Sequence, residues 1–144
     1  MTSLPAHLSD ADQAFLLGPR IGFLTVAPRP DEWPTPVPVW FEPVDHHDAV
    51  QLFTSRTSRK AHRLAATPRA SLVAANEIGE PENWVAVTGP TTVETDGAQE
   101  LAIRLAERYW DLANPDLARI AEGWRTDHSL IRVVIQAERV TRYA

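Results

Sequence analysis

The sequence predicts a mainly-β fold, in which an antiparallel β-barrel carries helices on its outside. Six short runs are rich in apolar and β-branched residues and are bounded by proline, glycine or polar turns. Only three or four segments show helical spacing, and strands do not alternate with helices over most of the length. Neither G-x-G-x-x-G nor G-x-x-x-x-G-K-[ST] occurs, which disfavours the parallel sheets that use these phosphate loops.

The composition is that of one ordinary globular domain spanning residues 1–144. Of the 144 residues, 44% are apolar and 23% charged, which argues against disorder. The absence of cysteine excludes disulfides, thiolate metal sites and cysteine nucleophiles. No apolar run approaches the ~20 residues that cross a bilayer, and the segment MTSLPAHLSD has no basic or apolar targeting region. We therefore expect a cytoplasmic protein that does not associate with membranes.

The first part of the chain reads as a helix followed by a hairpin. Ser9 and Asp12 have the spacing of an N-terminal cap for a helix over residues 10–17, which Gly18-Pro19 ends. Strands are expected over residues 21–27 and 36–42. Two prolines inside the second run cannot donate ladder hydrogen bonds, so this strand should lie at a sheet edge, where a ligand could face its backbone.

The remaining elements follow the same signals. The expected strands and helices, in order, are a strand over 49–54, a helix from Ser58 to about Thr67, a strand over 70–75, a long strand over 84–94 with a bend at Gly89-Pro90, an amphipathic helix over 96–110, a further helical turn or two within 114–122, and a closing strand over 130–143 that bends near Ala137.

The positive charge is concentrated in one segment of an otherwise acidic chain. The net charge is −5, yet residues 54–69 hold no acid and include the only lysine. The cations of this segment are Arg56, Arg59, Lys60, Arg63 and Arg69. So small a patch suits a small anionic ligand better than a nucleic acid, which needs a broader positive face.

Residues 53–60 (FTSRTSRK) lead from a strand end into a helix start. Hydroxyls, cations and the unpartnered first-turn N–H groups of the helix meet there, and the helix dipole is positive at that end. A phosphomonoester would fit such a corner. The alternative is that Ser58 only caps the helix while the arginines face solvent. Cations in a first turn oppose the dipole, which favours the ligand interpretation.

Four segments resemble a known family in their order and spacing: GFLTVAPRPDEWPTPVPVWF, LFTSRTSRKAHRLAATPRASLV, WVAVTGPTTVE and RVVIQAERVTRY. Together they look like the pyridoxamine 5′-phosphate oxidase-like, FMN-binding split-barrel superfamily, whose relatives include deazaflavin (coenzyme F-420) oxidoreductases. The resemblance covers roughly residues 9–143. It implies a split β-barrel of six or more mostly antiparallel strands.

The resemblance also implies a cofactor site. In the family's pattern, the arginine and lysine of S-R-K meet the flavin phosphate, an aromatic–threonine pair lies beside the flavin, and the backbone of the second strand runs along the ring. Trp84 falls near a glutamine that in the oxidase reaches the cofactor across the dimer. The cofactor-binding residues implied here are Lys60, Arg59, Ser58, Thr54, Phe53, Ser55, Arg56, Val37, Pro38, Val39, Trp40 and Trp84.

The expected function is therefore an FMN-binding oxidoreductase that works as a homodimer on a small molecule. The oxidase's strand-two arginine and lysine are replaced around Pro36-Val37-Pro38 and Phe41, so pyridoxamine phosphate itself is not the expected substrate. A deazaflavin (F-420) reductase is one alternative, since the cations of residues 56–63 suit its anionic tail. A non-catalytic flavin or haem carrier is a second. The ring would carry the chemistry, and no catalytic residue is assigned.

Two other groups of residues have simpler interpretations. His46 and His47 lie between two aspartates, but no third ligand has a supporting spacing, so a turn is expected and no metal site. Trp110 and Trp124 are expected to pack in the core or at a dimer contact.

Overall fold

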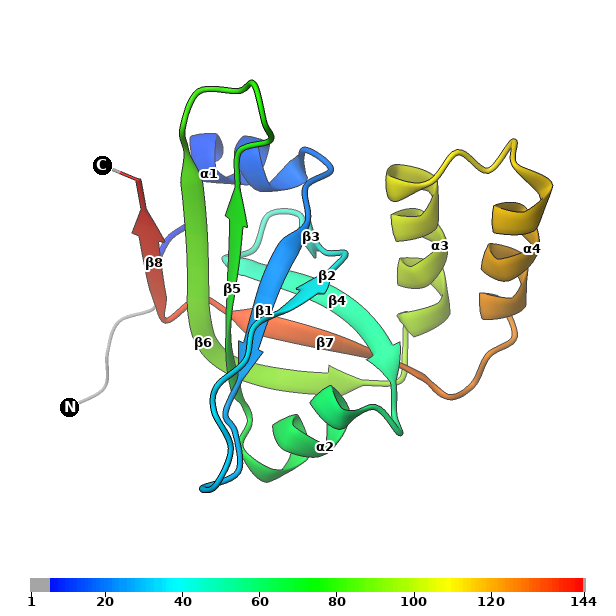
Figure 1. Cartoon of the computed structure of the whole chain (residues 1–144), viewed down its shortest axis with the longest axis horizontal. Helices are drawn as coiled ribbons and strands as arrows, with labels where there is room; N and C mark the ends of the chain where they lie inside the picture. Colours follow the sequence, from blue (N-terminus) through cyan, green and yellow to red (C-terminus); the bar gives the residue numbers. More distant parts are fainter. Residues whose placement is uncertain (1–5, 144) are drawn as a thin grey trace.

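Within residues 6–143, which the computed structural model describes, eight strands form one strongly curled antiparallel sheet (Figure 1). The strand order is β2-β1-β5-β6-β7-β4-β3, and β8 pairs with β6 outside this path. The predicted mainly-β split barrel with flanking helices is confirmed. Residues 1–5 and 144 lie outside the described part. The two ends of the domain expected over residues 1–144 fall there, and so does the first half of the segment MTSLPAHLSD, for which no targeting region is expected.

The elements of the first half are α1 (Asp10–Leu17), β1 (Gly22–Val26), β2 (Val37–Val39), β3 (Glu42–Pro43), β4 (Ala49–Ser55) and α2 (Arg59–Ala66). Those of the second half are β5 (Arg69–Ala75), β6 (Trp84–Glu94), α3 (Ala98–Tyr109), α4 (Pro115–Trp124), β7 (Leu130–Gln136) and β8 (Arg139–Arg142). No helix among the described residues is long and apolar enough to cross a membrane.

Two expected strands are each broken in two. The run over residues 36–42 becomes β2, which pairs with β1 at the sheet edge, and β3, which pairs with β4. The edge position agrees with the prolines of this run. The closing strand does not merely bend near Ala137: it breaks there, because the Ala137 N–H still donates to Asp48 beside β4, whereas the next N–H, of Glu138, donates to Thr88 of β6.

The structure also lengthens the second expected helical segment of the C-terminal half. Instead of one or two turns, α4 runs over ten residues. The Asn114 side chain accepts hydrogen bonds from the first-turn N–H groups, and Pro115 follows at the start, where its missing N–H costs nothing. In Figure 1, α3 and α4 stand side by side next to the curl of the sheet, where α3 contacts β4 and β7.

Strand β6 belongs to both halves of the barrel. Its first part, from Trp84 to Pro90, pairs with β5, and its last part, from Thr91 to Glu94, pairs with β7. The change of partner falls at the predicted Gly89-Pro90 bend. A Cβ at Gly89 would lie 1.8 Å from the Gln136 carbonyl oxygen, so only glycine lets the β7–β8 corner approach this closely.

The core fills the inside of the curl and the contacts with α1 and α2. Alternate residues of the strands point inward, as their period of two requires, and are fully buried. Leu16 of α1 and Leu64 of α2 join the same cluster. Helix α2 thereby holds a fixed position beside β1 and β4. The start of α2 consequently lies at the end of β4.

Asp12 ties the first helix to the last strand. Its carboxylate accepts from the Ser9 N–H at 2.8 Å and from Arg142 of β8 at 2.6–3.0 Å, while Ser9 caps the helix. Burial by itself opposes ionisation of Asp12, but the hydrogen bonds from Arg142 and Ser9 outweigh it, so the pKa of this carboxyl lies below its ordinary value.

Replacing this carboxylate should weaken the protein in a pH-dependent way. We expect Asp12→Asn to lower the free energy of unfolding by about 2 kcal/mol at pH 7, because Arg142 and the Ser9 N–H lose their charged acceptor. Because the pKa of Asp12 is lower in the folded than in the unfolded protein, the ionised carboxylate stabilises the fold in full above the unfolded pKa of about 3.9. This stabilisation is lost as the pH falls through the pKa of the folded protein. Urea unfolding at pH 7 and pH 3 should thus show the gap between variant and wild type narrowing in acid.

Asp10 provides the matched control, since it lies exposed in the same first turn. Asp10→Asn should change stability by only a few tenths of a kcal/mol, through the helix dipole alone. Equal effects of the two substitutions at pH 7 would contradict a special role for Asp12.

Candidate functional site

The corner between β4 and α2 is organised by hydroxyl groups. Ser58 is the N-cap of α2: its Oγ accepts from the Ala61 N–H at 3.1 Å and from the Thr54 hydroxyl at 3.0 Å. The hydroxyls of Ser55, at the end of β4, and of Thr57, in the loop that follows, bond to each other at 3.0 Å. Ser58 therefore caps the helix, and the earlier N–H groups of the turn point out of the helix without partners in it.

Lys60 lies beside an apolar hollow of about 360 Å³. The side chain is half-buried, although it belongs to the first turn of a surface helix. The other residues lining the hollow come from the start of β1, from the β2 segment and from β4: Ile21, Pro38, Val39, Trp40 and Phe53. One ammonium group thus stands at the side of a flat, largely apolar wall.

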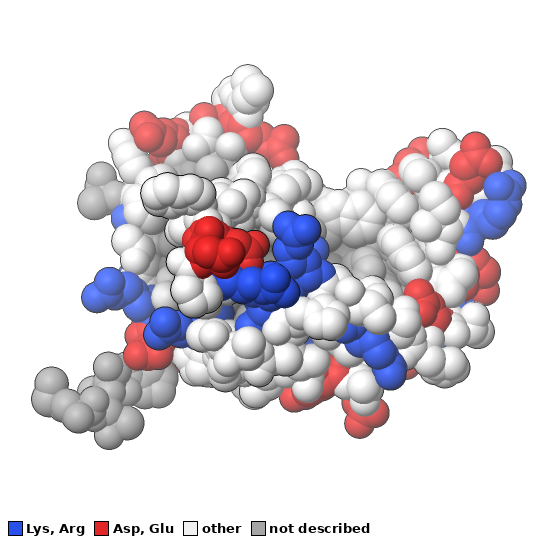
Figure 2. Space-filling view, turned by 60° about the horizontal axis from the view of Figure 1, so that its bottom comes forward, with Lys and Arg blue, Asp and Glu red and all other residues white. Residues whose placement is uncertain are grey.

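Figure 2 views the molecule from the side on which α2 lies. Cationic side chains gather in the middle of this face around an acidic group, and the surface is hollowed between the barrel and the α3–α4 pair. Two cations of residues 54–69, Arg59 and Arg63, line one hollow together with Arg29.

Behind the hollow, five aromatic rings pack in one cluster. Trp40 stacks on Tyr109 with centroids 5.1 Å apart and planes at 4°, and meets Trp110 edge-on at 4.7 Å. Trp124 contacts Trp40, Trp110 and Phe53 at 6.2, 5.6 and 5.2 Å. Trp110 and Trp124 thus pack internally, and α3 and α4 support the wall that Trp40 and Phe53 present to the hollow.

Tyr109 also holds the backbone of the β2–β3 segment. Its hydroxyl lies 2.6 Å from the Arg20 carbonyl oxygen and 3.2 Å from that of Phe41, and it accepts from the Phe41 N–H at 3.4 Å. Burial raises the pKa of Tyr109 above its ordinary value, against the lowering effect of these hydrogen bonds. The phenol therefore stays protonated and positions the residue next to Trp40.

The comparisons with known proteins agree with this arrangement. The family model described as pyridoxamine 5′-phosphate oxidase matches residues 8–142. The chain belongs to this family. None of the curated protein sequences gives a significant match.

Solved structures with the same fold share little sequence with this family member. A conserved hypothetical protein from Mycobacterium tuberculosis is 20% identical, with a TM-score of 0.69, over 99% of this chain and 89% of the other. An F420 reductase is 18% identical, with a TM-score of 0.69, over 90% and 94%. The haem storage protein HutZ from Vibrio cholerae is 14% identical, with a TM-score of 0.65, over 96% and 95%. At these identities the likeness shows the fold alone.

The structure brings together part of the site that the oxidase-family resemblance implies. Five of those residues line one hollow, namely Pro38, Val39, Trp40, Phe53 and Lys60. Thr54 is buried and bonded to Ser58, and Ser55 is the last residue of β4. Val37 packs against the barrel core. This oxidase-family chain thus places an aromatic wall, a strand edge and a lysine around one space.

Three of the implied residues lie elsewhere. Arg59 is exposed and lines a separate cationic hollow of about 410 Å³. Arg56 donates a hydrogen bond to the His128 carbonyl across the mouth of the β4–α2 loop. Trp84 begins β6, opposite Ala75 and next to Tyr143, and is not among the residues lining the Lys60 hollow. Lys60 is the one cation among the described residues that line this hollow.

Sequence reasoning did not find Ile21 or Tyr109. Tyr109 lies four residues after Leu105 on the apolar side of an amphipathic helix, so its spacing indicated only core packing. A tyrosine and a tryptophan side by side at a helix end were the available signal, since a buried phenol needs a hydrogen-bond partner.

Proposed function

We propose that this protein is an oxidoreductase that binds FMN, with the ring against the Trp40–Phe53 wall and the phosphate near Lys60. The observation that carries the proposal is the half-buried side chain of Lys60 beside an apolar, aromatic-lined hollow. A tricyclic ring needs a flat apolar surface, and its phosphate needs cations and N–H donors. Both are present within one corner of the fold.

The residues of the corner fit the chemistry of such a cofactor. The first-turn N–H groups of α2 and the Ser55 and Thr57 hydroxyls could donate to phosphate oxygens, with Lys60 supplying charge. Bound flavin would supply hydride or electron transfer. The protein's part is to orient the ring, to neutralise the phosphate and to keep water from the ring face. The absence of a cation at Pro36-Val37-Pro38 continues to argue for a substrate other than pyridoxamine phosphate.

The proposal includes a homodimer that completes the site. The hollow beside Lys60 is open on one side in a single chain, and Ile21 at its edge is 42% exposed. Phe23, on the outer face of the neighbouring strand β1, is 44% exposed. Apolar side chains left in water beside an open ligand site suit a second subunit that covers them and closes the hollow.

A deazaflavin cofactor is the second candidate, favoured by one specific feature. The hollow of about 410 Å³ that adjoins the start of α2 is lined by cations and histidine: Arg29, Arg59, His62 and Arg63. Glu32 neutralises part of this charge through Arg63 at 3.0 Å. F-420 extends a flavin-like ring and phosphate with an anionic tail, for which this hollow offers partners that FMN would not use.

Removing the ammonium of Lys60 tests the assignment. Lys60→Ala should weaken FMN binding at least tenfold, the ~1.4 kcal/mol expected of one charge-assisted contact, measured by quenching of flavin fluorescence. Riboflavin has the same ring but no phosphate, and its affinity should change by less than about twofold. That selective loss identifies the phosphate as the group that Lys60 meets.

Arg119→Ala serves as a charge-matched control, because Arg119 lies exposed on α4 and pairs only with Asp116 of the same helix. It should leave both affinities unchanged. Unaltered FMN affinity in Lys60→Ala would overturn the phosphate assignment. The absorption spectrum of the purified protein, followed by titration with FMN, F-420 and haem, discriminates the flavin, deazaflavin and carrier hypotheses.

A further inference from the structure

Glu42 carries a buried carboxylate that the proposed cofactor site does not use. It belongs to the short strand β3, and the residue is only 8% exposed. One carboxylate oxygen, Oε1, accepts from Gln51 Nε2 at 2.9 Å and from Arg104 Nε and Nη2 at 3.1 and 2.7 Å. The other oxygen, Oε2, accepts no hydrogen bond from residues 6–143, and Arg108 Nη2, at 3.8 Å, is too distant to donate one. This buried carboxylate is thus bonded through one oxygen only.

The free oxygen of this carboxylate is open to solvent. Within residues 6–143, the fully enclosed side-chain atoms that lack a hydrogen-bond partner are Arg20 Nε and Thr91 Oγ1, and Glu42 Oε2 is not among them. Since Glu42 lines a hollow of about 710 Å³, Oε2 is its accessible acceptor there. A carboxylate oxygen in this position has lone pairs that a donor group of a ligand can use.

The walls of this hollow, the Glu42 hollow, combine charge with apolar surface. Ala14 and Leu17 line it from α1. Gln51 of β4 and Arg104 of α3 line it beside Glu42. Because Nε and Nη2 of Arg104 both donate to Glu42, the guanidinium is held in place, while its Nη1 donates to no acceptor in the described part of the chain. An open carboxylate oxygen, a guanidinium with a free N–H group and an apolar helix face therefore meet in one space.

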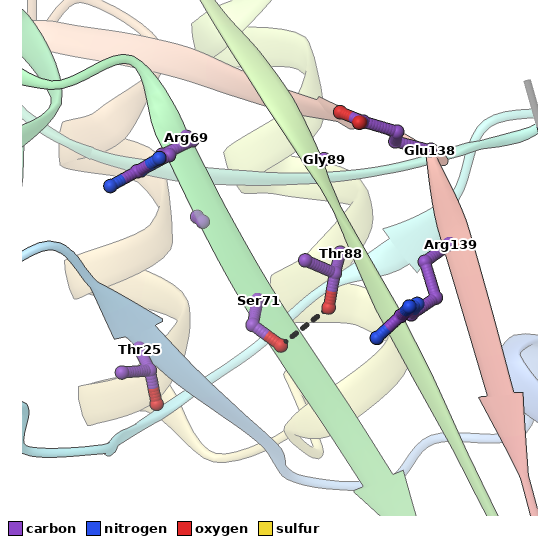
Figure 3. A pocket seen from close by; sticks show the side chains of 8 residues that line it. Thr25, Arg69, Ser71, Thr88, Gly89, Glu138 and Arg139 are labelled. Atoms are coloured by element: carbon purple, nitrogen blue, oxygen red, sulfur yellow. Dashed lines mark hydrogen bonds between the residues drawn. The ribbon is translucent and has the colours of Figure 1, made fainter. Parts of the chain in front are cut away.

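The Glu42 hollow is separate from the other sites of the fold. Figure 3 shows another hollow, over a row of polar residues that are successive partners in the strand register: Thr25, Ser71, Thr88 and Arg139. Thr25 lies two residues after Phe23 on β1, so that hollow belongs to the face that the proposed second subunit covers. The Glu42 hollow takes no lining residue from β1, β5, β6 or β8, and shares none with the Lys60 hollow.

We propose that the Glu42 hollow binds a small amino acid with an apolar side chain, as a zwitterion. The ammonium group of the ligand donates to Glu42 Oε2, and its carboxylate accepts from Arg104 Nη1, so that both contacts are charge-assisted hydrogen bonds. The side chain of the ligand packs on Ala14 and Leu17. A ligand with a single charge would meet one like charge in the hollow, whereas a zwitterion meets two opposite charges. The volume lies in the range of small-molecule sites.

Titration of the full chain with L-leucine at constant ionic strength, followed by amide chemical shifts, tests this site. The amides of Ala14, Glu42 and Gln51 should shift along a saturable curve. Leucinamide lacks the carboxylate and 4-methylpentanoate lacks the ammonium group, so each should bind at least about tenfold more weakly than L-leucine. Lys60→Ala should leave the response unchanged, which separates this site from the proposed cofactor site.

Two arginine substitutions on α1 form a matched pair. Ala14 and Ala11 are both exposed on this helix, but Ala14 lines the hollow and Ala11 does not. Ala14→Arg places a long cation where the ammonium group of the ligand would lie, and it should abolish the saturable response. Ala11→Arg adds the same charge outside the hollow and should leave the response unchanged.

Glu42→Gln keeps the shape of the side chain, removes its charge and should weaken L-leucine binding at least about tenfold. The amide spectrum of each variant reports whether it is folded, and if Glu42→Gln does not fold, the pair of α1 variants decides. The proposal is overturned if the three amides shift linearly with L-leucine, if leucinamide or 4-methylpentanoate binds equally well, or if Ala14→Arg and Ala11→Arg behave alike.

Discussion

Gly89→Ala should lower the free energy of unfolding by about 3 kcal/mol or more. The added Cβ would lie 1.8 Å from the Gln136 carbonyl oxygen and 2.9 Å from the Glu138 nitrogen. Both neighbours are backbone atoms, so no side-chain rotation relieves the overlap. The β7–β8 corner must move away, which breaks the hydrogen bond from Glu138 N–H to the Thr88 carbonyl. Urea unfolding measures the loss, and hydrogen exchange at Glu138 shows where it arises.

Gly123→Ala is the matched control in the same chain. Gly123 lies within α4, and nothing would lie within 4 Å of a Cβ built there. Alanine in a helix is more favourable than glycine by about 0.5–1 kcal/mol, so this variant should be slightly more stable than wild type. If both variants behaved alike, the close approach at Gly89 would not be what requires glycine.

Trp40→Ala should produce the second large effect, a loss of about 3 kcal/mol of stability together with loss of the ring wall. Trp40 contacts the rings of Tyr109, Trp110 and Trp124, so its removal opens the centre of the aromatic cluster. The expected signature is a lower urea midpoint and a changed near-ultraviolet circular dichroism spectrum, since the remaining tryptophans lose their coupled neighbour. FMN affinity should fall as well, because Trp40 lines the proposed ring site.

Trp33→Ala separates this effect from the mere loss of a tryptophan. Trp33 is 88% exposed, and its truncation should change stability by no more than about 0.5 kcal/mol. Trp40→Phe keeps an apolar ring and should recover part of the lost stability. Equal stability of the Trp40→Ala and Trp33→Ala variants would show that the cluster contributes nothing to the fold.

Local chemistry made most of the elements predictable. The Ser9–Asp12 cap, the Ser58 cap and the Gly89-Pro90 bend depend on residues that act on their immediate neighbours, and all three appear where expected. The edge position of β2 followed from its prolines, which lack the N–H that an inner strand must donate. Breaks were harder to predict, since the end of β7 depends on Asp48 and Thr88, which lie far away in sequence.

Within the site, the positive corner was predictable because its charges are adjacent along the chain. The sequence did not predict which hollow each of these side chains lines. Lys60 and Arg59 are neighbours in sequence but line different hollows, because consecutive residues on a helix point about 100° apart. Tyr109 escaped prediction because its hydrogen bonds reach backbone carbonyl groups 68 and 89 residues away.

By itself, then, the sequence determined the order of strands and helices, the edge position of the proline-rich strand and the location of the positive segment. These depend on residue type and short spacings, which act through local backbone geometry and through charge. The tertiary structure alone decided that Trp40 meets α3 and α4, that Lys60 faces an aromatic wall, and that Thr25, Ser71, Thr88 and Arg139 form one row. Each of these depends on strand register and helix packing, which bring together residues that no local pattern connects.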